Sequence, residues 1–317
     1  MIKTCLITGS TGFIGKNLTP YLNKRNIVCN ILSRKELNAA EINNLNPNDT
    51  VIHLAGKAHD VHKHAKPYEY YQVNFDLTKK LYDAFLGSDA EKFIYISSIK
   101  AVADECDEIL TENTIPEPQT DYGISKLLAE QYIQSQPLPS GKSYYILRPC
   151  MTHGPGNKGN LNLLYKLIEK GLPYPLAAFN NMRSFVSIQN LCFVISEIVN
   201  RDDIHTDVYH ISDDEPLSTT EVVSLIASSI NKKPYLWKIS PWLISSVAKL
   251  GDFFHLPLTS DRLQKMTSSF VVSNYKIKKV IKKPLPVDVR DGIKITASSF
   301  NIETEEIIQY DQKPVYT

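Results

Sequence analysis

The sequence predicts an α/β fold: a doubly wound parallel sheet followed by a smaller C-terminal α/β domain. Short apolar runs suited to buried parallel strands alternate with segments of helical periodicity along the first half of the chain. A glycine-rich turn joins the first of these runs to the first helix, which is the arrangement of a dinucleotide-binding unit. The length of 317 residues suits about two domains.

Composition narrows the classes of function. Hydrophobic residues make up 43% and charged residues 22% of the chain, and the net charge of +1 gives no overall attraction to nucleic acid or membrane. The five cysteines are scattered, without a Cys-x-x-Cys pair, which favours reduced thiols in a cytoplasmic protein. We find no apolar run long enough to span a bilayer and no secretory signal. A cytoplasmic protein without a nucleic-acid partner or a membrane span is therefore expected.

The first predicted strand, Lys3–Thr8, is followed by glycines with the spacing Gly-x-x-Gly-x-x-Gly and then by a helical pattern. Glycines let the backbone approach a pyrophosphate, and the helix N-terminus offers unpaired N–H groups. The alternative is a plain turn with coincidental glycines. We expect this turn to bind a dinucleotide through Gly9, Gly12, Phe13, Ile14 and Gly15.

The second predicted strand, Ile27–Leu32, ends in Ser33, Arg34 and Lys35. An acidic residue about 20 residues past the glycines would bind the ribose 2′-hydroxyl of NAD. No acidic residue stands directly at this strand end, and a serine with two cations suits a 2′-phosphate. NADP(H) is therefore favoured as the cofactor, NAD(H) stays possible, and the alternative for Arg34 is a solvated loop charge.

The third predicted strand begins at Thr50 and ends in small residues, Leu54, Ala55 and Gly56, which would let a cofactor lie close. A basic, histidine-rich loop follows. No carboxylate or thiol completes a metal-ligand set there, so no metal is expected. The loop is either a solvated basic segment or a lip over the cofactor that faces the substrate with Lys57 and His59. Asn74, at the start of the next helix, either caps that helix or reaches the neighbouring strand.

Polar groups converge at the carboxyl ends of these strands, where open parallel sheets bind ligands. Ser98 ends the strand that begins at Lys92, and Pro149 follows the next strand, which begins at Tyr144. Tyr122 and Lys126 lie one turn apart on the helix between these strands. An ammonium beside a phenol lowers the phenol pKa, so this tyrosine is a candidate for proton transfer.

Together these motifs resemble the extended short-chain dehydrogenase/reductases, the group of NAD(P)-dependent sugar-nucleotide epimerases and dehydratases. The resemblance covers about residues 1–300. It rests on Thr8–Gly15, His53–Gly56, Asn74, Ser97–Ser98, Thr111–Glu112, Tyr122–Lys126, Arg148–Pro149, Gly154–Gly156 and Arg183–Leu191.

The resemblance implies roles for the matching residues. Tyr122 would be the general acid/base, Lys126 would lower its pKa and hold the nicotinamide ribose, and Ser98 would bind the reacting C4 oxygen. The diphosphate of the substrate would be bound by Asn160, Arg183 and Arg262, since a guanidinium matches phosphate in bidentate geometry. The implied cofactor contacts are Gly9, Gly12, Phe13, Ile14, Gly15, Ser33, Arg34, Leu54, Ala55, Gly56, Asn74, Tyr122, Lys126 and Pro149.

Two departures from the family pattern narrow the expected reaction. Ile99 and Lys100 follow Ser98 where dehydratases of this group carry an Asp-Glu pair, so dehydration is not expected. Met151 and His153 replace the usual Asn and Tyr, and we expect them to reshape the nicotinamide edge or the sugar pocket.

The expected activity is hydride transfer at C4 of a UDP-hexose or UDP-N-acetylhexosamine, in polysaccharide precursor synthesis. A 4-epimerase regenerates its cofactor, whereas a 4-ketoreductase consumes NAD(P)H, and the NADPH preference tilts the prediction toward the reductase. The alternative is a non-catalytic NADP(H)-binding interaction protein on the same fold. A homodimer is expected through the helices that contain Leu77–Phe85 and Leu127–Tyr132.

The predicted domains are a Rossmann domain, residues 1–155 with parts of 180–212, and a sugar-nucleotide-binding domain, residues 156–180 and 213–317. Within the smaller domain we expect a helix over 162–170, a strand over 234–239 and an unusually apolar helix over 241–254. The apolar helix is expected to pack inside this domain, with a membrane- or partner-facing role as the alternative. The lysines between 276 and 283 are expected to form a solvated helix face.

Overall fold

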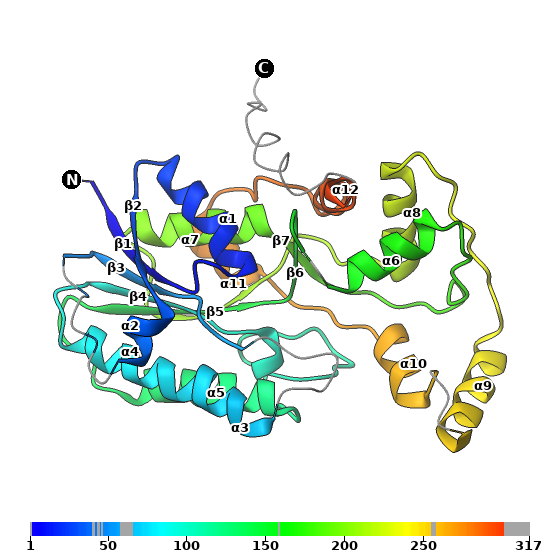
Figure 1. The fold of residues 1–317 in the computed structure, drawn as a ribbon, viewed down its shortest axis with the longest axis horizontal. Coiled ribbons are helices and arrows are strands. Elements are labelled where there is room, and N and C mark those ends of the chain that lie inside the picture. The colour runs from blue at the N-terminus through cyan, green and yellow to red at the C-terminus, as the bar shows by residue number, and fades with distance from the viewer. Residues whose placement is uncertain are drawn as a thin grey trace.

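The central sheet confirms the predicted doubly wound α/β fold. The computed structural model describes residues 2–39, 42, 45, 47–57, 66–157, 159–254 and 258–300. Within these ranges six parallel strands run in the order β2-β1-β3-β4-β5-β8 (Figure 1). The strand order reverses between β1 and β3, so the ligand crevice of such a sheet is expected at their carboxyl ends. The strands are β1 Thr4–Thr8, β2 Val28–Leu32, β3 Thr50–His53, β4 Lys92–Ile96, β5 Ser143–Pro149 and β8 Asp207–Ile211.

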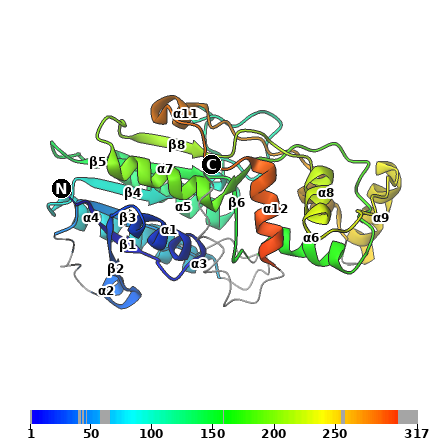
Figure 2. The same ribbon diagram turned by 90° about the horizontal axis from the view of Figure 1, so that it is seen from above.

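Helices cover both faces of this sheet. Helices α1 and α7 lie on one face and α4 and α5 on the other, as Figures 1 and 2 show. The helices of this part of the chain are α1 Phe13–Asn23, α2 Arg34–Asn38, α3 Pro67–Tyr70, α4 Leu77–Leu86, α5 Asp121–Ser135, α7 Ile188–Asn200 and α11 Tyr275–Ile281, with a π-helical segment η1 Tyr71–Asp76 and a 3₁₀ turn η2 Ile99–Ala101.

The alternation of side chains along the strands divides the core into two layers. Cys5 and Ile7 of β1 pack with Leu18 and other residues of α1 and α7. Leu6, between them in sequence, points to the opposite face and packs with the apolar residues of α4 and α5. The inner strands β1, β3, β4 and β5 are largely buried on both faces, as their continuous apolar runs predict, whereas the edge strand β2 exposes Val28 and Ile31.

A third apolar cluster lies beyond the sheet and joins α6, α8 and α12. Its elements are β6 Met151–His153, β7 Phe185–Ser187, α6 Asn160–Glu169, α8 Thr219–Ser229, α9 Pro241–Phe254, α10 Ser260–Thr267 and α12 Val289–Ser299. Leu161, Tyr165 and Ile168 form the buried face of α6, whereas Leu163 is exposed. The predicted domain boundaries stay a prediction.

Two further expectations for this region are corrected or refined. The predicted strand over 234–239 is not formed; its Leu236 and Lys238 make only isolated bridges to Tyr174 and Leu176. The lysines of α11 lie on a charged surface, as expected, and three of the lysines in this stretch pair with carboxylates: Lys276 with Asp207, Lys278 with Asp214 and Lys283 with Glu197.

A buried ion pair attaches α5 to the sheet. The Glu130 carboxylate of α5 accepts hydrogen bonds from Nε of Arg148 of β5 at 3.0 and 3.1 Å and from its Nη2 at 2.5 Å. Ser97, just after β4, donates a further hydrogen bond to the same carboxylate. Glu130 is fully buried and Arg148 nearly so. One helix and two strands are therefore joined at a single buried charge pair, whose donors and acceptors are largely satisfied.

Substitution of Glu130 by Gln tests this attachment, because it leaves the Arg148 guanidinium buried without a counter-ion. We expect the free energy of unfolding, measured by urea denaturation, to fall by about 3–5 kcal/mol. The control is Lys265→Gln, since Lys265 pairs with Asp261 on the surface, and loss of an exposed partner costs about 0.2–1 kcal/mol. Equal losses in the two variants would contradict a supporting role for the buried pair.

Candidate active site

The glycine loop after β1 combines two kinds of glycine. Gly9 has a φ of +70°, and a Cβ on it would lie 2.6 Å from the backbone N of Ala55. A Cβ on Gly15 would lie 2.4 Å from the carbonyl O of Gly9. These two glycines are therefore required by the close approach of the protein's own backbone segments. They bring the ends of β1 and β3 into contact at the point where the strand order reverses.

Gly12 differs from Gly9 and Gly15. A Cβ on Gly12 would meet only the carbonyl O of Gly9, at 3.2 Å, within a 4 Å radius. Gly12 is also the N-cap of α1 and provides no side-chain hydrogen bond, and no acidic residue stands in the first turn. Phe13 and Ile14, the first residues of the helix, pack against the core below it. The first turn of α1 thus offers backbone N–H groups above an apolar base, which fits a dinucleotide pyrophosphate.

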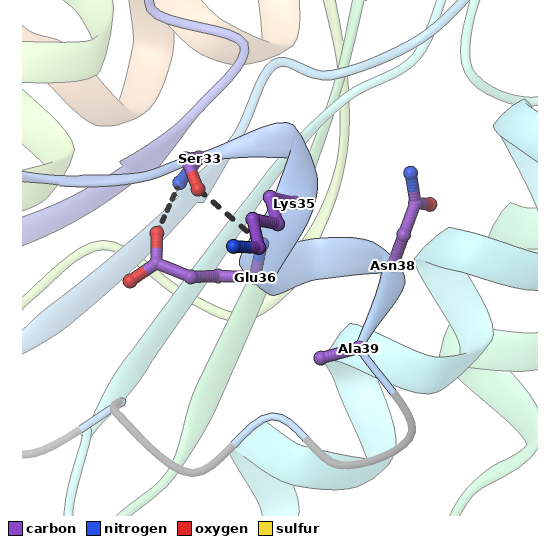
Figure 3. Close-up of a pocket in the computed structure, with 5 residues that line it drawn as sticks. All are labelled: Ser33, Lys35, Glu36, Asn38 and Ala39. Carbon is purple, nitrogen blue, oxygen red and sulfur yellow. Dashed lines mark hydrogen bonds between the residues drawn. The ribbon is translucent and has the colours of Figure 1, made fainter.

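The end of β2 lies next to this loop, because Leu32 is paired with Thr8. Ser33 caps α2: its Oγ accepts from the Glu36 N–H at 3.3 Å, and its own N–H donates to the Glu36 carboxylate at 2.8 Å (Figure 3). A surface hollow here is lined by Ser33, Lys35, Glu36, Asn38 and Ala39. Arg34 is exposed at the first position of the helix.

Glu36 is a residue that the sequence analysis missed. It lies four residues past the strand end rather than directly at it, but the capping interaction folds its carboxylate back beside Ser33. Hydrogen bonding with the Ser33 side chain and, second, with the Ser33 N–H lowers the pKa of Glu36, which keeps it charged. The capping-box spacing of Ser33 and Glu36 was the available signal. The hollow therefore presents both cationic and anionic groups beside the glycine loop.

Asn74 joins the segment after β3 to α5. It is fully buried inside η1, not at a helix start, so the interpretation as a helix cap was wrong. Its Oδ1 accepts from the Lys57 N–H at 2.7 Å, and its Nδ2 donates to the Lys57 carbonyl and to Ser125 Oγ, both at 3.1 Å. These contacts hold the chain after Gly56 against α5. A Cβ on Gly56 would lie 3.3 Å from Lys126 Nζ, so this segment borders the lysine directly.

His53, the last residue of β3, stabilises the same edge of the sheet through hydrogen bonds of its ring. Its ring nitrogens contact Thr8 Oγ1 at 2.7 Å and Thr78 Oγ1 at 2.9 Å. Burial, together with the charge of Lys126, lowers the pKa of His53 to about 3. The ring is therefore neutral and works as a hydrogen-bonded link between β1, β3 and α4, not as an acid or base of the site.

Ser98, Tyr122 and Lys126 meet at the carboxyl ends of β4 and β5. Ser98 precedes η2 and interacts with the Tyr122 phenol through a hydrogen bond. Lys126 Nζ donates to the Ile96 carbonyl at 2.9 Å and lies over the Tyr95 ring. Burial lowers the pKa of Lys126 to about 8, although Glu130 opposes this shift.

The expected lowering of the Tyr122 pKa by Lys126 is not found. Burial raises the pKa of Tyr122 above its ordinary value, the hydrogen bond with Ser98 acts against this, and Tyr70 adds to the increase. The ring of Tyr70 packs edge-on against Tyr122, with centroids 6.1 Å apart. The ammonium of Lys126 is turned to the Ile96 carbonyl, so desolvation decides the charge state of the phenol. Tyr122 is therefore held as a neutral phenol.

Two cations approach one another beyond Ser98. Lys100, which the sequence analysis used only to exclude dehydration, donates to the Asp104 carbonyl at 2.7 Å and lies over the Phe270 ring. Arg183 pairs its backbone with Phe270 and Leu217, and its guanidinium donates to the Ser268 carbonyl at 3.1 Å. Burial lowers the pKa of Lys100, and the charge of Arg183 contributes to this lowering. The position of Lys100 four residues after the end of β4 was the signal for it.

The remaining predicted residues lie in different places. Lys57 forms an ion pair with Glu69, Pro149 ends β5, and Leu54 and Ala55 follow β3 beside the glycine loop. Asn160 is exposed at the first position of α6, and Arg262 lies on α10, whose last turn Arg183 contacts. His59 falls outside the residues that the structure describes.

His153 does not line the site. It is fully buried in β6, and its Nδ1 contacts Thr296 Oγ1 of α12 at 2.9 Å. It ties β6 to α12 in the interior, and the expectation that Met151 and His153 reshape the nicotinamide edge or the sugar pocket stays a prediction. Over the described ranges, no group of three potential metal ligands occurs, and no helix is both long and apolar enough to cross a membrane.

Comparison with known proteins agrees with this geometry. Residues 5–212 match the NAD dependent epimerase/dehydratase family. A UDP-glucose 4-epimerase of Vibrio cholerae is 30% identical over 323 aligned positions, which cover 95% of this chain and 96% of the relative. These two matches agree with the resemblance found in the motifs.

Solved structures show the same fold. RMD from Pseudomonas aeruginosa complexed with NADPH superposes with a TM-score of 0.72 and 19% identity, over 94% of this chain and 99% of that structure. MoeE5 in complex with UDP-glucuronic acid and NAD superposes with a TM-score of 0.71 and 20% identity, over 94% and 99%. Sequence motifs, sheet topology and family match lead to one conclusion: this chain belongs to the NAD dependent epimerase/dehydratase family of nucleotide-sugar enzymes.

Proposed function

We propose that the protein transfers a hydride at C4 of a UDP-linked hexose or N-acetylhexosamine, as a 4-epimerase or a 4-ketoreductase. The observation that carries the proposal is the meeting of Ser98, Tyr122 and Lys126 at the sheet edge next to the glycine loop. A hydroxyl, a phenol and an amine at this edge suit proton transfer at a carbinol or carbonyl oxygen. A bound nicotinamide dinucleotide would supply the hydride acceptor or donor.

The chain's own residues would handle the proton. In the reductive direction, the neutral Tyr122 phenol donates its proton to the C4 oxygen while Ser98 holds that oxygen by a hydrogen bond. In the oxidative direction, Tyr122 receives the C4 hydroxyl proton. Lys126, with a pKa of about 8, is largely protonated at neutral pH and would bind the ribose next to Gly56.

The substrate diphosphate would bind between Lys100 and Arg183. Both side chains are cations beside Phe270, since Lys100 lies over its ring and Arg183 pairs with its backbone. Lys100 also forms an ion pair with Asp104, at 3.6 Å. An anion between them would relieve their repulsion, which favours a diphosphate at this point. The backbone N–H groups at the start of α6, near Asn160, are free of a side-chain cap and extend the anion site. No acid pair follows Ser98 in the sequence, so dehydration is not proposed.

For the cofactor we propose a preference for NADP(H), because Arg34 and Lys35 adjoin the Ser33 hollow. Glu36 opposes this preference, since its carboxylate would repel a 2′-phosphate and suits a ribose hydroxyl. Arg34 and Lys35 supply two positive charges against the single carboxylate of Glu36, which already accepts a hydrogen bond from Ser33. The balance of charge therefore favours the 2′-phosphate. A homodimer through α4 and α5 and a cytoplasmic location also stay proposals.

Purified protein incubated with UDP-GlcNAc, UDP-glucose or UDP-4-keto-6-deoxy-GlcNAc tests the activity. Formation of the C4 isomer without added cofactor identifies an epimerase, and NADPH oxidation in proportion to a keto sugar identifies a reductase.

Tyr122→Phe should lower kcat about 10²–10⁴-fold, the usual contribution of general acid–base catalysis, with little change in cofactor binding. Tyr275→Phe, at an exposed tyrosine of α11, is the control. Near-normal turnover by the Tyr122 variant would remove this residue from its role.

Substitution of Arg34 by Ala tests the cofactor preference. We expect the Kd of NADPH to rise about tenfold or more while that of NADH stays within about twofold, because only NADPH carries the 2′-phosphate that a guanidinium binds. Fluorescence titration of each cofactor measures both constants. Arg25→Ala, at an arginine that stacks on Tyr21, is the control. Tighter binding of NADH by the unsubstituted protein would show that Glu36 decides the preference instead.

Alanine substitution of Gly12 tests the proposed pyrophosphate site, and alanine substitution of Gly87 is the matched control. Ala at Gly12 would project a methyl group from the N-cap of α1, so we expect NAD(P)H binding to weaken about tenfold or more. The free energy of unfolding should change by less than about 1 kcal/mol. Ala at Gly87 meets its nearest atom at 3.9 Å and should leave cofactor binding unchanged. Unaltered binding by the Gly12 variant would place the pyrophosphate elsewhere.

A further inference from the structure

The helix α9 is not packed as its sequence predicts. Only Ile244, Ala248 and Gly251 are buried, whereas the large apolar side chains of this helix are exposed to solvent. Trp242 is 72%, Phe253 78% and Phe254 63% exposed. We refer to the exposed apolar residues of this helix as the outer face of α9: Trp242, Leu243, Val247, Leu250, Phe253 and Phe254.

The outer face is the side turned away from the other residues that the structure describes. Ile244, Ala248 and Gly251 are spaced three and four residues apart, so they share one narrow helix face, and this face packs on the protein. α9 and α10 contact each other, and both views place α9 at the end of the molecule remote from the central sheet (Figures 1 and 2). Exposed apolar side chains of this size and number on one helix mark an interaction surface.

The residues around α9 are those of a membrane interface. Both tryptophans of the chain lie here, at positions 237 and 242, and both are exposed, as is Tyr235. Aromatic rings with one polar atom prefer the boundary between lipid headgroups and acyl chains. Residues 231–267 carry six lysines and arginines against two aspartates, a net charge of +4, whereas the whole chain carries +1. These cations are exposed: Lys232, Lys233, Lys238, Lys249, Arg262 and Lys265.

We propose that the outer face of α9, with the aromatic residues Tyr235 and Trp237 before it, binds the surface of an anionic phospholipid bilayer. The helix would lie in the interface with its apolar residues below the headgroups and the flanking cations near the lipid phosphates. Its 14 residues are too few to cross a bilayer, so the attachment is peripheral. This proposal does not depend on which sugar the enzyme acts on.

Charge favours a bilayer over a second copy of this chain as the occupant. A two-fold contact through the outer face of α9 would bring two segments of net charge +4 together, and like charges at an interface oppose association. An anionic lipid surface instead attracts these cations. The charge pattern therefore selects the anionic bilayer.

Vesicle binding tests the proposal. We expect the full-length protein to sediment with vesicles of phosphatidylcholine and phosphatidylglycerol in a roughly 2:1 ratio, and much less with phosphatidylcholine alone or in about 1 M salt. Tryptophan emission should shift to the blue on binding, and no other tryptophan of the chain contributes to it. Trp242→Ser combined with Phe253→Ser should weaken binding about tenfold or more. Ile115→Ser, at an exposed apolar residue elsewhere, should leave binding unchanged.

Circular dichroism and turnover of the UDP-sugar in solution show whether the variant remains folded, and we expect both to match the unsubstituted protein. Absence of binding to the anionic vesicles, or equal binding by the double variant, overturns the proposal. Sedimentation equilibrium tests the alternative that a second copy of this chain binds the outer face of α9. If the double substitution converts a dimer to a monomer and vesicles are not bound, then the outer face of α9 is a subunit interface and the proposal is wrong.

Discussion

The buried pair between Glu130 and Arg148 is the interaction on which the arrangement of the active site depends. Apolar contacts alone leave a helix free to shift along a sheet, since one aliphatic side chain replaces another with little loss. A carboxylate that receives several N–H bonds from one guanidinium has a defined position, and displacement would leave two charges buried and unpaired. The hydrogen bond from Ser97 fixes the same carboxylate against β4, so α5 has one register on the sheet.

That register sets the chemistry, because Lys126 and Tyr122 precede Glu130 on α5 by one and two turns. With the helix held in place, Lys126 reaches the Ile96 carbonyl at the end of β4, and Tyr122 reaches Ser98 just beyond it. Glu130 also counters the desolvation of the lysine, which keeps the pKa of Lys126 near 8 instead of lower. Next to Lys126, Ser125 and Asn74 connect α5 to the segment that carries Gly56. The same helix thus links the proton-transfer residues to the expected cofactor crevice.

The sequence was sufficient for the features that depend on local pattern. Periodicity and glycine spacing predicted the parallel sheet, its flanking helices and the turn after β1, because each is encoded within a few consecutive residues. The sequence was insufficient where the outcome depends on the burial of a side chain or on the direction in which it points. Asn74 has the composition of a helix cap, yet the helix begins earlier, at Pro67, and the amide is buried in mid-segment. Glu36 lies beyond the strand end, and only the folding of α2 returns its carboxylate to Ser33.

By itself the sequence determined the α/β class, the family motifs and the candidate trio of Ser98, Tyr122 and Lys126, since strand ends and helix periodicity place these residues on one edge. The tertiary structure decided the electrostatics and the exposure. Spacing suggests that Lys126 lowers the pKa of Tyr122, whereas the folded chain turns the ammonium to a carbonyl and burial raises that pKa. Composition alone predicts that an apolar helix such as α9 packs in the core. Whether its apolar face is covered depends on which distant segments reach it, and the neighbours in the described structure cover only its small residues.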